Sequence, residues 1–168
     1  MRPGVNLIIF EEDLSRINAC LTTLHHQARS KAVLLIDRNG QFIASTGETA
    51  SLDTTSLATL AAGNMAAAGG LAQVVGEREF SILFHEGERE HVHISVIGGR
   101  VILIVLFDHR SSLGLVRFRV KISSREIEGI FDELTRRLER DGEQSRTLRE
   151  SGFTEITDED IENLFGMG

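Results

Sequence analysis

The sequence predicts an α+β sandwich, with a five-stranded, mostly antiparallel sheet, helices on both of its faces and a short C-terminal tail helix. Three observations lead to this fold class. Apolar residues recur at helical spacing in separate segments, short strands come in pairs joined by polar turns, and one strand, "RVILIVLFD", shows no polar alternation. Such a strand is covered on both faces, as in the middle of a sheet with helices on each side.

The first half of the chain predicts a helix, a hairpin and a second helix. Apolar residues at helical spacing run from Glu11 to Arg29, and "KAVLLID" and "QFIAST" then form two strands. Asn39 and Gly40 stand between these strands and tolerate the positive φ of a tight hairpin turn. After the loop "GETASLD", either Asp53 or Thr54 is expected to cap the second helix.

The second half predicts three further strands and a long helix. "FSILFHE" and "HVHISVI" are joined by the turn "GERE", and "GG" leads into "RVILIVLFD". Either Ser111 or Ser112 is expected to cap a helix that ends near Arg140. The element order is therefore α-β-β-α-β-β-β-α plus the tail helix. We expect one domain over 1–140, a flexible linker over 141–155 and an acidic amphipathic helix over 156–166.

Composition and charge argue against several functions. The formal net charge is -7, and the chain from Glu150 onward holds acidic residues but no Lys or Arg, so the rest is almost neutral. Without a basic field and with few aromatic residues, nucleic-acid binding is not expected. No apolar run reaches the ~20 residues that span a bilayer, so no membrane insertion is expected. The lone cysteine, Cys20, fits a reducing cytoplasm.

No recognised catalytic motif occurs in the sequence. A Gly-rich phosphate loop, a nucleophile elbow, CxxC and HExxH are all missing, so no catalytic site and no cofactor are expected. One histidine cluster carries an alternative. His91 and His93 point to one face of a strand, and His85 lies across the hairpin, so the three imidazoles could ligate zinc. The ordinary explanation is a set of exposed strand residues near a turn.

Two further sets of charged residues have both a functional and an ordinary explanation. Asp37 and Asp108 end adjacent strands, which allows a carboxylate pair, although strand-end turn formers have the same composition. Loop arginines could be offered to a nucleotide, but nothing in their spacing singles one out from solvated side chains. These arginines are Arg78, Arg89, Arg100 and Arg110.

The second helix has no charged residue on any face. "LATLAAGNMAAAGGLAQ" runs from Leu57 to Gln73 and includes three glycines, each of which weakens a helix by roughly 0.5–1 kcal/mol relative to Ala. A helical wheel predicts an inner stripe of Leu57, Leu60, Asn64, Ala68, Leu71 and Val75. It predicts an outer face of Thr59, Ala62, Gly63, Ala66, Gly70 and Gln73. An uncharged outer face is either buried between layers of its own domain or forms an interface with a second subunit or a partner.

The tail admits similar alternatives. Ile156, Ile161, Leu164 and Phe165 line one side of a short acidic helix that is too short to be stable alone in water. It could dock on its own domain, dock on a partner with a basic groove, or remain disordered.

Several of these segments together resemble the roadblock/dynein light-chain family. The resemblance rests on "DTTSLATLAAGNMAAAGGLAQVVGE", "FHEGE", "RVILIVLFD", "SSLGLVRFRVK" and "ITDEDIENLF", and it runs from about Leu7 to Phe165. It implies a homodimer whose sheets join edge to edge, with the second helices of both subunits side by side. It further implies that the dimer binds a GTP-bound small Ras-like GTPase of the MglA type and stimulates hydrolysis without an arginine finger, by repositioning the GTPase's own switch regions.

The resemblance also assigns residues. It implies a partner face centred on Ala62, Ala66 and Gly70, with Thr59, Gly63 and Gln73 around it, and a tail contact through Ile161, Leu164 and Phe165. The tail is further expected to promote nucleotide exchange, and the biological setting is cell polarity and gliding motility at a cell pole. The linker "RDGEQSRTLRESG" has no match. Two other hypotheses stay open: a scaffold that binds a GTPase without changing hydrolysis, and the histidine metal module.

Overall fold

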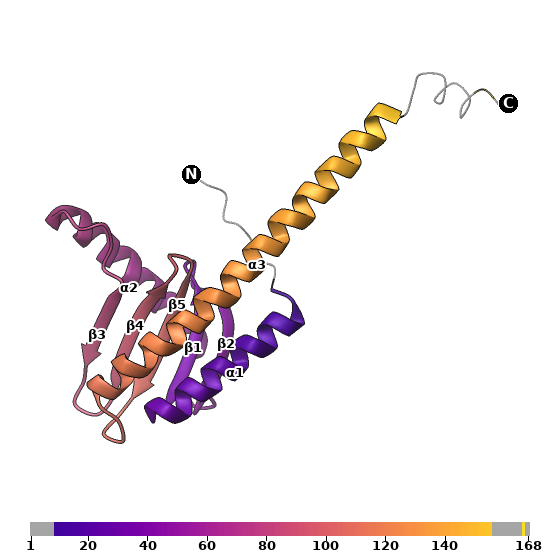
Figure 1. The fold of residues 1–168 in the computed structure, drawn as a ribbon. Helices are drawn as coiled ribbons and strands as arrows, with labels where there is room; N and C mark the ends of the chain where they lie inside the picture. Colours follow the sequence, from indigo (N-terminus) through magenta and orange to yellow (C-terminus); the bar gives the residue numbers. More distant parts are fainter. Residues whose placement is uncertain (1–8, 156–165, 167–168) are drawn as a thin grey trace. The chain divides into compact units, whose positions relative to one another are not determined.

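The computed structural model describes residues 9–155 and 166, and within these it confirms the predicted fold class. The order is α-β-β-α-β-β-β-α, and the chain divides into two compact units, Met1–Ile130 and Phe131–Gly168. The sheet and all its helical layers belong to the first unit (Figure 1). The predicted tail helix at 156–166, with its contact residues, lies outside the described residues except for position 166.

The sheet is antiparallel throughout and has the spatial order β2-β1-β5-β4-β3. Its strands are β1 (Ala32–Asp37), β2 (Phe42–Gly47), β3 (Ile82–Glu86), β4 (His91–Ile97) and β5 (Val101–Phe107). Every residue of β5 is buried, as its unbroken apolar run predicts. The strands β2 and β3 form the two edges of the sheet.

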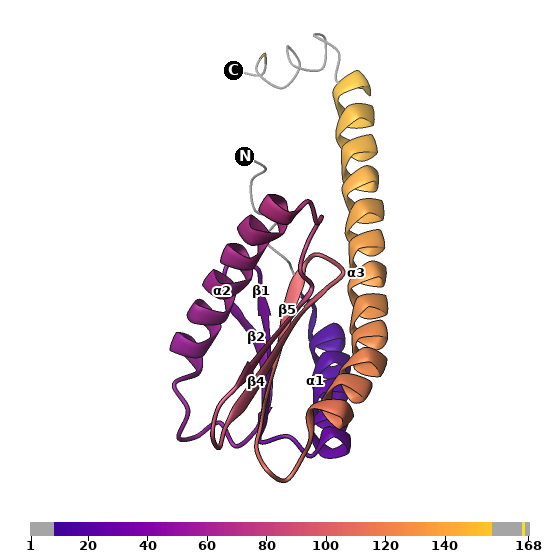
Figure 2. The ribbon, with the colours of Figure 1, turned by 90° about the vertical axis from the view of Figure 1, so that its left-hand side faces the viewer.

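Helices cover both faces of the sheet. α2 (Thr54–Val75) lies on one face, and α1 (Glu11–Ala28) lies on the other beside the first part of α3 (Leu113–Glu155), as Figure 2 shows. The thiol of Cys20 on α1 donates to the carboxylate of Glu126 on α3 over 3.1 Å, so these two helices are neighbours. Burial and this acceptor raise the pKa of the Cys20 thiol to about 12, which keeps the thiol protonated and unreactive.

The structure confirms the predicted helix caps and the first hairpin turn. Asp53 caps α2, because its carboxylate accepts the backbone N–H of Ser56 at 3.0 Å, and Ser112 caps α3 through Leu115 at 3.2 Å. Gly40 adopts φ +87 in the first hairpin, and a Cβ there would lie 3.2 Å from the Cα of Thr59, so the turn needs glycine on both counts.

The predicted end of the third helix is wrong. We expected the helix to stop near Arg140, but α3 continues to Glu155 through the segment predicted as a linker. Glu, Arg, Gln and Leu dominate this segment and are strong helix formers, whereas Gly142 and Gly152 cost only about 1 kcal/mol each. Polarity alone therefore does not make a linker, and the flexibility expected there stays a prediction.

α2 also departs from an expectation about membranes. By length and composition it is the one helix among the described residues that would be long and apolar enough to cross a bilayer. The expectation that no segment reaches that length is therefore wrong. Core helices of folded domains meet the same criteria, and one stripe of α2 packs against the sheet.

Candidate interaction face on the second helix

The inner stripe of α2 consists of small residues. Ala58, Ala61, Ala62, Met65, Ala68 and Ala72 are buried, and most of them pack against apolar residues of β1, β4 and β5. Small side chains let the helix backbone approach the sheet closely, so the stripe needs only one large residue, Met65, to fill the core. Leu57 is half-buried at the edge of this cluster.

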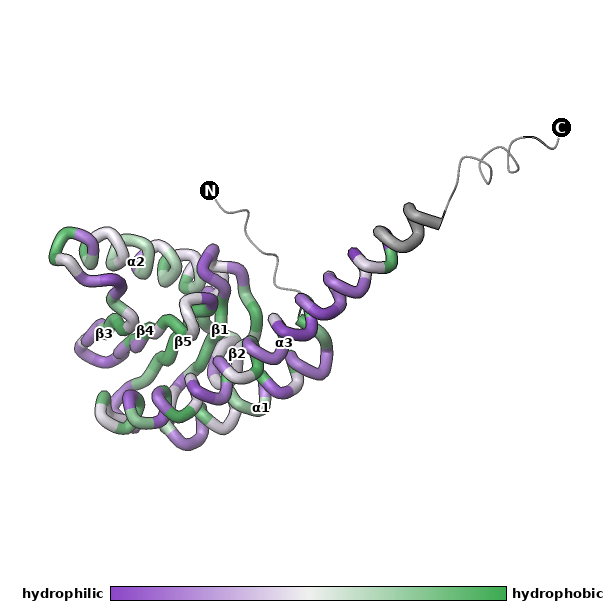
Figure 3. The backbone as a smooth tube through the Cα atoms, turned by 45° about the horizontal axis from the view of Figure 1, so that its top comes forward, coloured by the Kyte–Doolittle hydropathy of each residue, from purple (hydrophilic) through white to green (hydrophobic). Residues whose placement is uncertain are grey.

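The opposite side of α2 carries the large apolar residues. Leu60 is 71% exposed and Val74 is 83% exposed, with Leu71 and Val75 exposed as well. Exposed glycines and alanines lie between them, and a Cβ added at Gly63 or Gly70 would meet nothing within 4 Å. Figure 3 shows α2 largely in green and white, whereas the far part of α3 is mostly purple. This outer face of α2 is thus apolar, uncharged and open.

The predicted orientation of α2 about its own axis is wrong. Leu60, Leu71 and Val75 were expected inside but are exposed, and Ala62 was expected outside but is only 9% exposed. A helix with apolar residues all round gives the wheel no polar side to orient by. The missed signal is that the stripe through Ala58, Ala61, Ala62 and Met65 contains no Gly or polar residue. The remaining predicted face residues are exposed, and their role as a contact stays a prediction: Thr59, Gly63, Ala66, Gly70 and Gln73.

The three histidines do not form a metal site. In the β3–β4 ladder His85 pairs with Val92, whereas His93 pairs with Phe84. Paired residues share a face of the sheet, so His85 lies on the α2 side and His91 and His93 lie on the other. His85 instead meets the side-chain amide of Asn64 on α2 at 2.6 Å. Within the described part of the chain, no group of three or more His, Cys, Asp or Glu could hold a metal.

The ordinary explanation holds for the two aspartates. Asp37 pairs with Val101 at the start of β5, whereas Asp108 follows the end of β5, so antiparallel pairing puts the carboxylates at opposite ends of that strand. The Asp37 carboxylate accepts the N–H of Asn39 at 2.8 Å and organises the first hairpin turn. Asp108 is ion-paired with Arg110 at 3.0 Å, which lowers the pKa of its carboxyl to about 2.

Among the described residues, the loop arginines have structural or exposed positions. Arg110 is engaged by Asp108 and by Glu48, the latter at 3.4 Å, so this arginine holds two loops in place. Arg78 and Arg89 are exposed, and Arg100 is half-buried at the β4–β5 turn.

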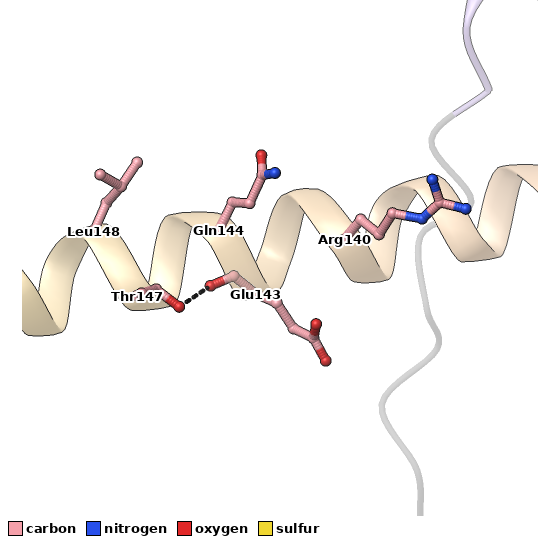
Figure 4. Close-up of a pocket in the computed structure, with 5 residues that line it drawn as sticks. All are labelled: Arg140, Glu143, Gln144, Thr147 and Leu148. Carbon is pink, nitrogen blue, oxygen red and sulfur yellow. Dashed lines mark hydrogen bonds between the residues drawn. The ribbon is translucent and has the colours of Figure 1, made fainter.

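The second unit presents a helix surface rather than a site. Figure 4 shows Arg140, Glu143, Gln144, Thr147 and Leu148 along a single stretch of α3. Thr147 donates from its hydroxyl to the backbone carbonyl of Glu143 at 2.9 Å, a bond within the helix. All five residues come from α3, so this surface lacks the convergent groups of a ligand site.

The fold and the open α2 face define a small α+β domain with helices on both faces of its sheet and an exposed apolar helix face. The roadblock/LC7 domain model matches residues 23–107, and the chain belongs to this family. The chain is similar to the solved structure of Myxococcus xanthus MglB, with 50% identity, a TM-score of 0.72, and coverage of 76% of this chain and 96% of that one.

Two other solved structures extend the comparison. The gliding protein MglB of Thermus thermophilus is 29% identical with a TM-score of 0.72, covering 78% of this chain and 99% of that one. A roadblock/LC7 domain of Streptomyces avermitilis is 13% identical with a TM-score of 0.62, covers 68% of this chain and 96% of that one, and shows the fold alone. Comparison with curated protein sequences gave no significant match.

Proposed function

We propose that this chain is a homodimeric activator of a small Ras-like GTPase of the MglA type. The observation that carries the proposal is the open, uncharged outer face of α2 in a chain that is 50% identical to Myxococcus xanthus MglB. A small domain leaves a contiguous apolar face open chiefly where another protein binds. A regulator role also fits the similarity to MglB from two bacteria.

The proposed dimer joins β3 to β3 of a second copy. β3 is an edge strand whose outer side pairs with no other strand of the described chain, and it follows the end of α2 that exposes Leu71, Val74 and Val75 (Figure 1). Pairing of two such edges would bring the two α2 helices side by side and bury these side chains. One solved MglB, 28% identical with a TM-score of 0.72 and covering 79% of this chain and 99% of that one, is described as having a tetrameric arrangement.

The proposed mechanism is positioning. The dimer would bind the GTP-bound GTPase through the outer α2 face and hold the switch regions in the arrangement that hydrolysis needs, without donating an arginine. The tail residues Ile161, Leu164 and Phe165 would add a second contact that promotes nucleotide exchange. The biological role would be control of cell polarity and gliding motility in the cytoplasm, at a cell pole.

A charge on the outer face tests this proposal. Gly70→Arg places a cation where a Cβ meets nothing within 4 Å, so the subunit itself has room for it. Gly129→Arg on α3 is a matched control, because Gly129 is also exposed, helical and open. We expect Gly70→Arg to lower the stimulation of hydrolysis at least about tenfold, since a desolvated charge is costly in an apolar interface, whereas Gly129→Arg leaves it unchanged.

The outcomes separate the alternatives. Full stimulation by a folded Gly70→Arg protein would reject the outer α2 face as the GTPase contact. If the wild-type chain binds the GTPase but hydrolysis is equal with and without it, the chain is a scaffold and the activator role is rejected.

A further inference from the structure

A cavity of about 540 Å³ lies on the face of the sheet opposite α2. Its floor is formed by His93 and Ser95 of β4, whose neighbour Ile94 points into the α2-side core. Its wall is formed by the first turns of α3, and all its residues belong to the first compact unit. The volume is in the range of pockets that hold small organic molecules. The proposed GTPase contact on α2 does not use this cavity, whereas the proposed dimer edge shares with it the start of β3 at Ile82.

The floor of the cavity carries buried polar side chains. His93 is 1% exposed and Ser95 is 5% exposed. Both ring nitrogens of His93 and the hydroxyl of Ser95 lack a hydrogen-bond partner among the residues that the structure describes. Burial, followed by the charge of Arg117, lowers the pKa of His93 to about 4, so the imidazole is neutral near pH 7 and keeps one N–H donor. Folded proteins rarely leave such groups unsatisfied without a reason.

The wall of the cavity carries three cations in a row. Arg117, Lys121 and Arg125 follow one another at four-residue spacing on α3 and all line the cavity. None of the three forms an ion pair within the described chain, and like charges at this spacing repel each other. Glu128 is the one carboxylate among the lining residues, so the wall remains net positive.

Apolar side chains complete the rim. Ile82 at the start of β3 and Phe118 on α3 both line the cavity and are exposed. The cavity thus combines hydrogen-bond donors on its floor, cations on one wall and an apolar rim. A ligand that matches all three has an anionic group at one end and an apolar body at the other.

We propose that this cavity binds a small organic anion whose phosphate or carboxylate group meets Arg125, Lys121 and the hydroxyl of Ser95, and whose apolar body packs on Ile82 and Phe118. The anion relieves the repulsion among the α3 cations and accepts a hydrogen bond from the buried hydroxyl of Ser95. This site is separate from the proposed GTPase contact, because α2 and the cavity lie on opposite faces of the sheet, and it shares only Ile82 with the edge strand β3.

The test is calorimetric titration of the full chain with three probes: phenyl phosphate, benzoate and inorganic phosphate. We expect saturable binding of phenyl phosphate or benzoate with one site per chain, at least about fivefold tighter than inorganic phosphate because of the apolar body. Binding of only one of the two organic probes identifies phosphate or carboxylate as the preferred group, and either result supports the site.

Two variants and a control locate the binding. Ser95→Ala removes a buried hydroxyl that has no hydrogen-bond partner in the described part of the chain, so the fold should be retained while the probe binds at least about fivefold more weakly. Arg125→Glu reverses one wall charge and should abolish binding. Arg89→Glu makes the same charge change in the β3–β4 turn, outside the cavity, and should leave the affinity within about twofold.

Two results would overturn the proposal. One is the absence of saturable binding of both organic probes, or binding no tighter than that of inorganic phosphate. The other is binding that survives both Ser95→Ala and Arg125→Glu, which would place the probe elsewhere, for example on the outer α2 face. Unfolding midpoints of the variants show that each is folded, and GTPase stimulation measured in parallel keeps this test separate from the proposed function.

Discussion

At the scale of single residues, His93 shows how burial changes the chemistry of a side chain. The sequence places it in a strand with two other histidines, and the natural hypothesis is a shared metal. Strand alternation instead puts His85 on the opposite face, and His93 is buried on the α3 side without a hydrogen-bond partner among the described residues. An unsatisfied buried polar group costs about 1–3 kcal/mol. Burial of His93 therefore lowers the free energy of unfolding. The loss grows as pH falls, because the folded chain resists protonation of the imidazole.

The pH dependence of stability follows from the lowered pKa of His93. Its pKa falls from the usual 6.5 to about 4 in the folded chain, so between these values the unfolded chain binds the extra proton. The free energy of unfolding should therefore decrease as pH falls from 6.5 toward 4, and His93 should contribute no slope above that window. Urea unfolding at about pH 7.5 and about pH 5 measures the change.

A non-titrating variant isolates this contribution. In His93→Gln the loss of stability between the two pH values should be smaller than in the wild-type chain. Equal losses in both proteins would mean that His93 titrates normally and is not desolvated as described.

At the scale of elements, α2 is where sequence reasoning and structure diverge. Its existence, its Asp53 cap and its lack of charge are all visible in the sequence, because they depend on local patterns. The orientation of α2 about its axis is not visible in the sequence. Apolar side chains surround the helix, and only packing decides which of them face the sheet. In the structure the alanines around Met65 face the sheet and allow close approach, whereas Leu60 and Leu71 lie outside.

Overpacking tests this rotation. Ala62 is buried, and its Cβ lies 3.4 Å from the position that a Cβ on Gly40 would take, so Ala62→Leu must displace the β1–β2 turn. We expect a loss of about 1–3 kcal/mol in the free energy of unfolding. Ala67→Leu on the exposed side should change it by less than about 0.5 kcal/mol. Both losses are measured by urea unfolding. A larger loss for Ala67→Leu than for Ala62→Leu would favour the orientation of α2 that the helical wheel predicts.

The same contrast holds for the other elements. The antiparallel hairpins and the buried β5 were predictable, since turn chemistry and an apolar strand determine them locally. The end of α3 is not predictable in this way, because "RDGEQSRTLRESG" has the polar composition of a linker but consists mainly of helix-forming residues. The cavity above β4 was also missed. It joins His93 of one strand to cations on a helix that begins only after the next strand, a contact that no local pattern encodes.

At the scale of the whole molecule, the sheet is the structural reason to expect a second subunit. Its edge strands β2 and β3 remain open within the described chain, and the apolar end of α2 lies next to β3 in the sequence. Folded proteins seldom leave an apolar face beside an open edge strand uncovered.

Light scattering tests the assembly. We expect a molar mass of twice the 18.6 kDa of one chain. The double variant Leu71→Lys, Val74→Lys should shift the protein toward monomer, because burying two charges between helices is costly. Leu148→Lys, an equally exposed change on the far part of α3, should leave the mass unchanged. A wild-type monomer at micromolar concentration, or a dimer that tolerates both lysines, would contradict the proposed interface.

The proposed activator function is measured most directly by single-turnover GTP hydrolysis by a Ras-like GTPase of the MglA type, with and without saturating wild-type chain. We expect a rate constant higher by about tenfold or more with the chain present, because positioning of the switch regions lowers the barrier. An unchanged rate constant, measured while binding is shown to be saturated, would contradict the proposed activator function.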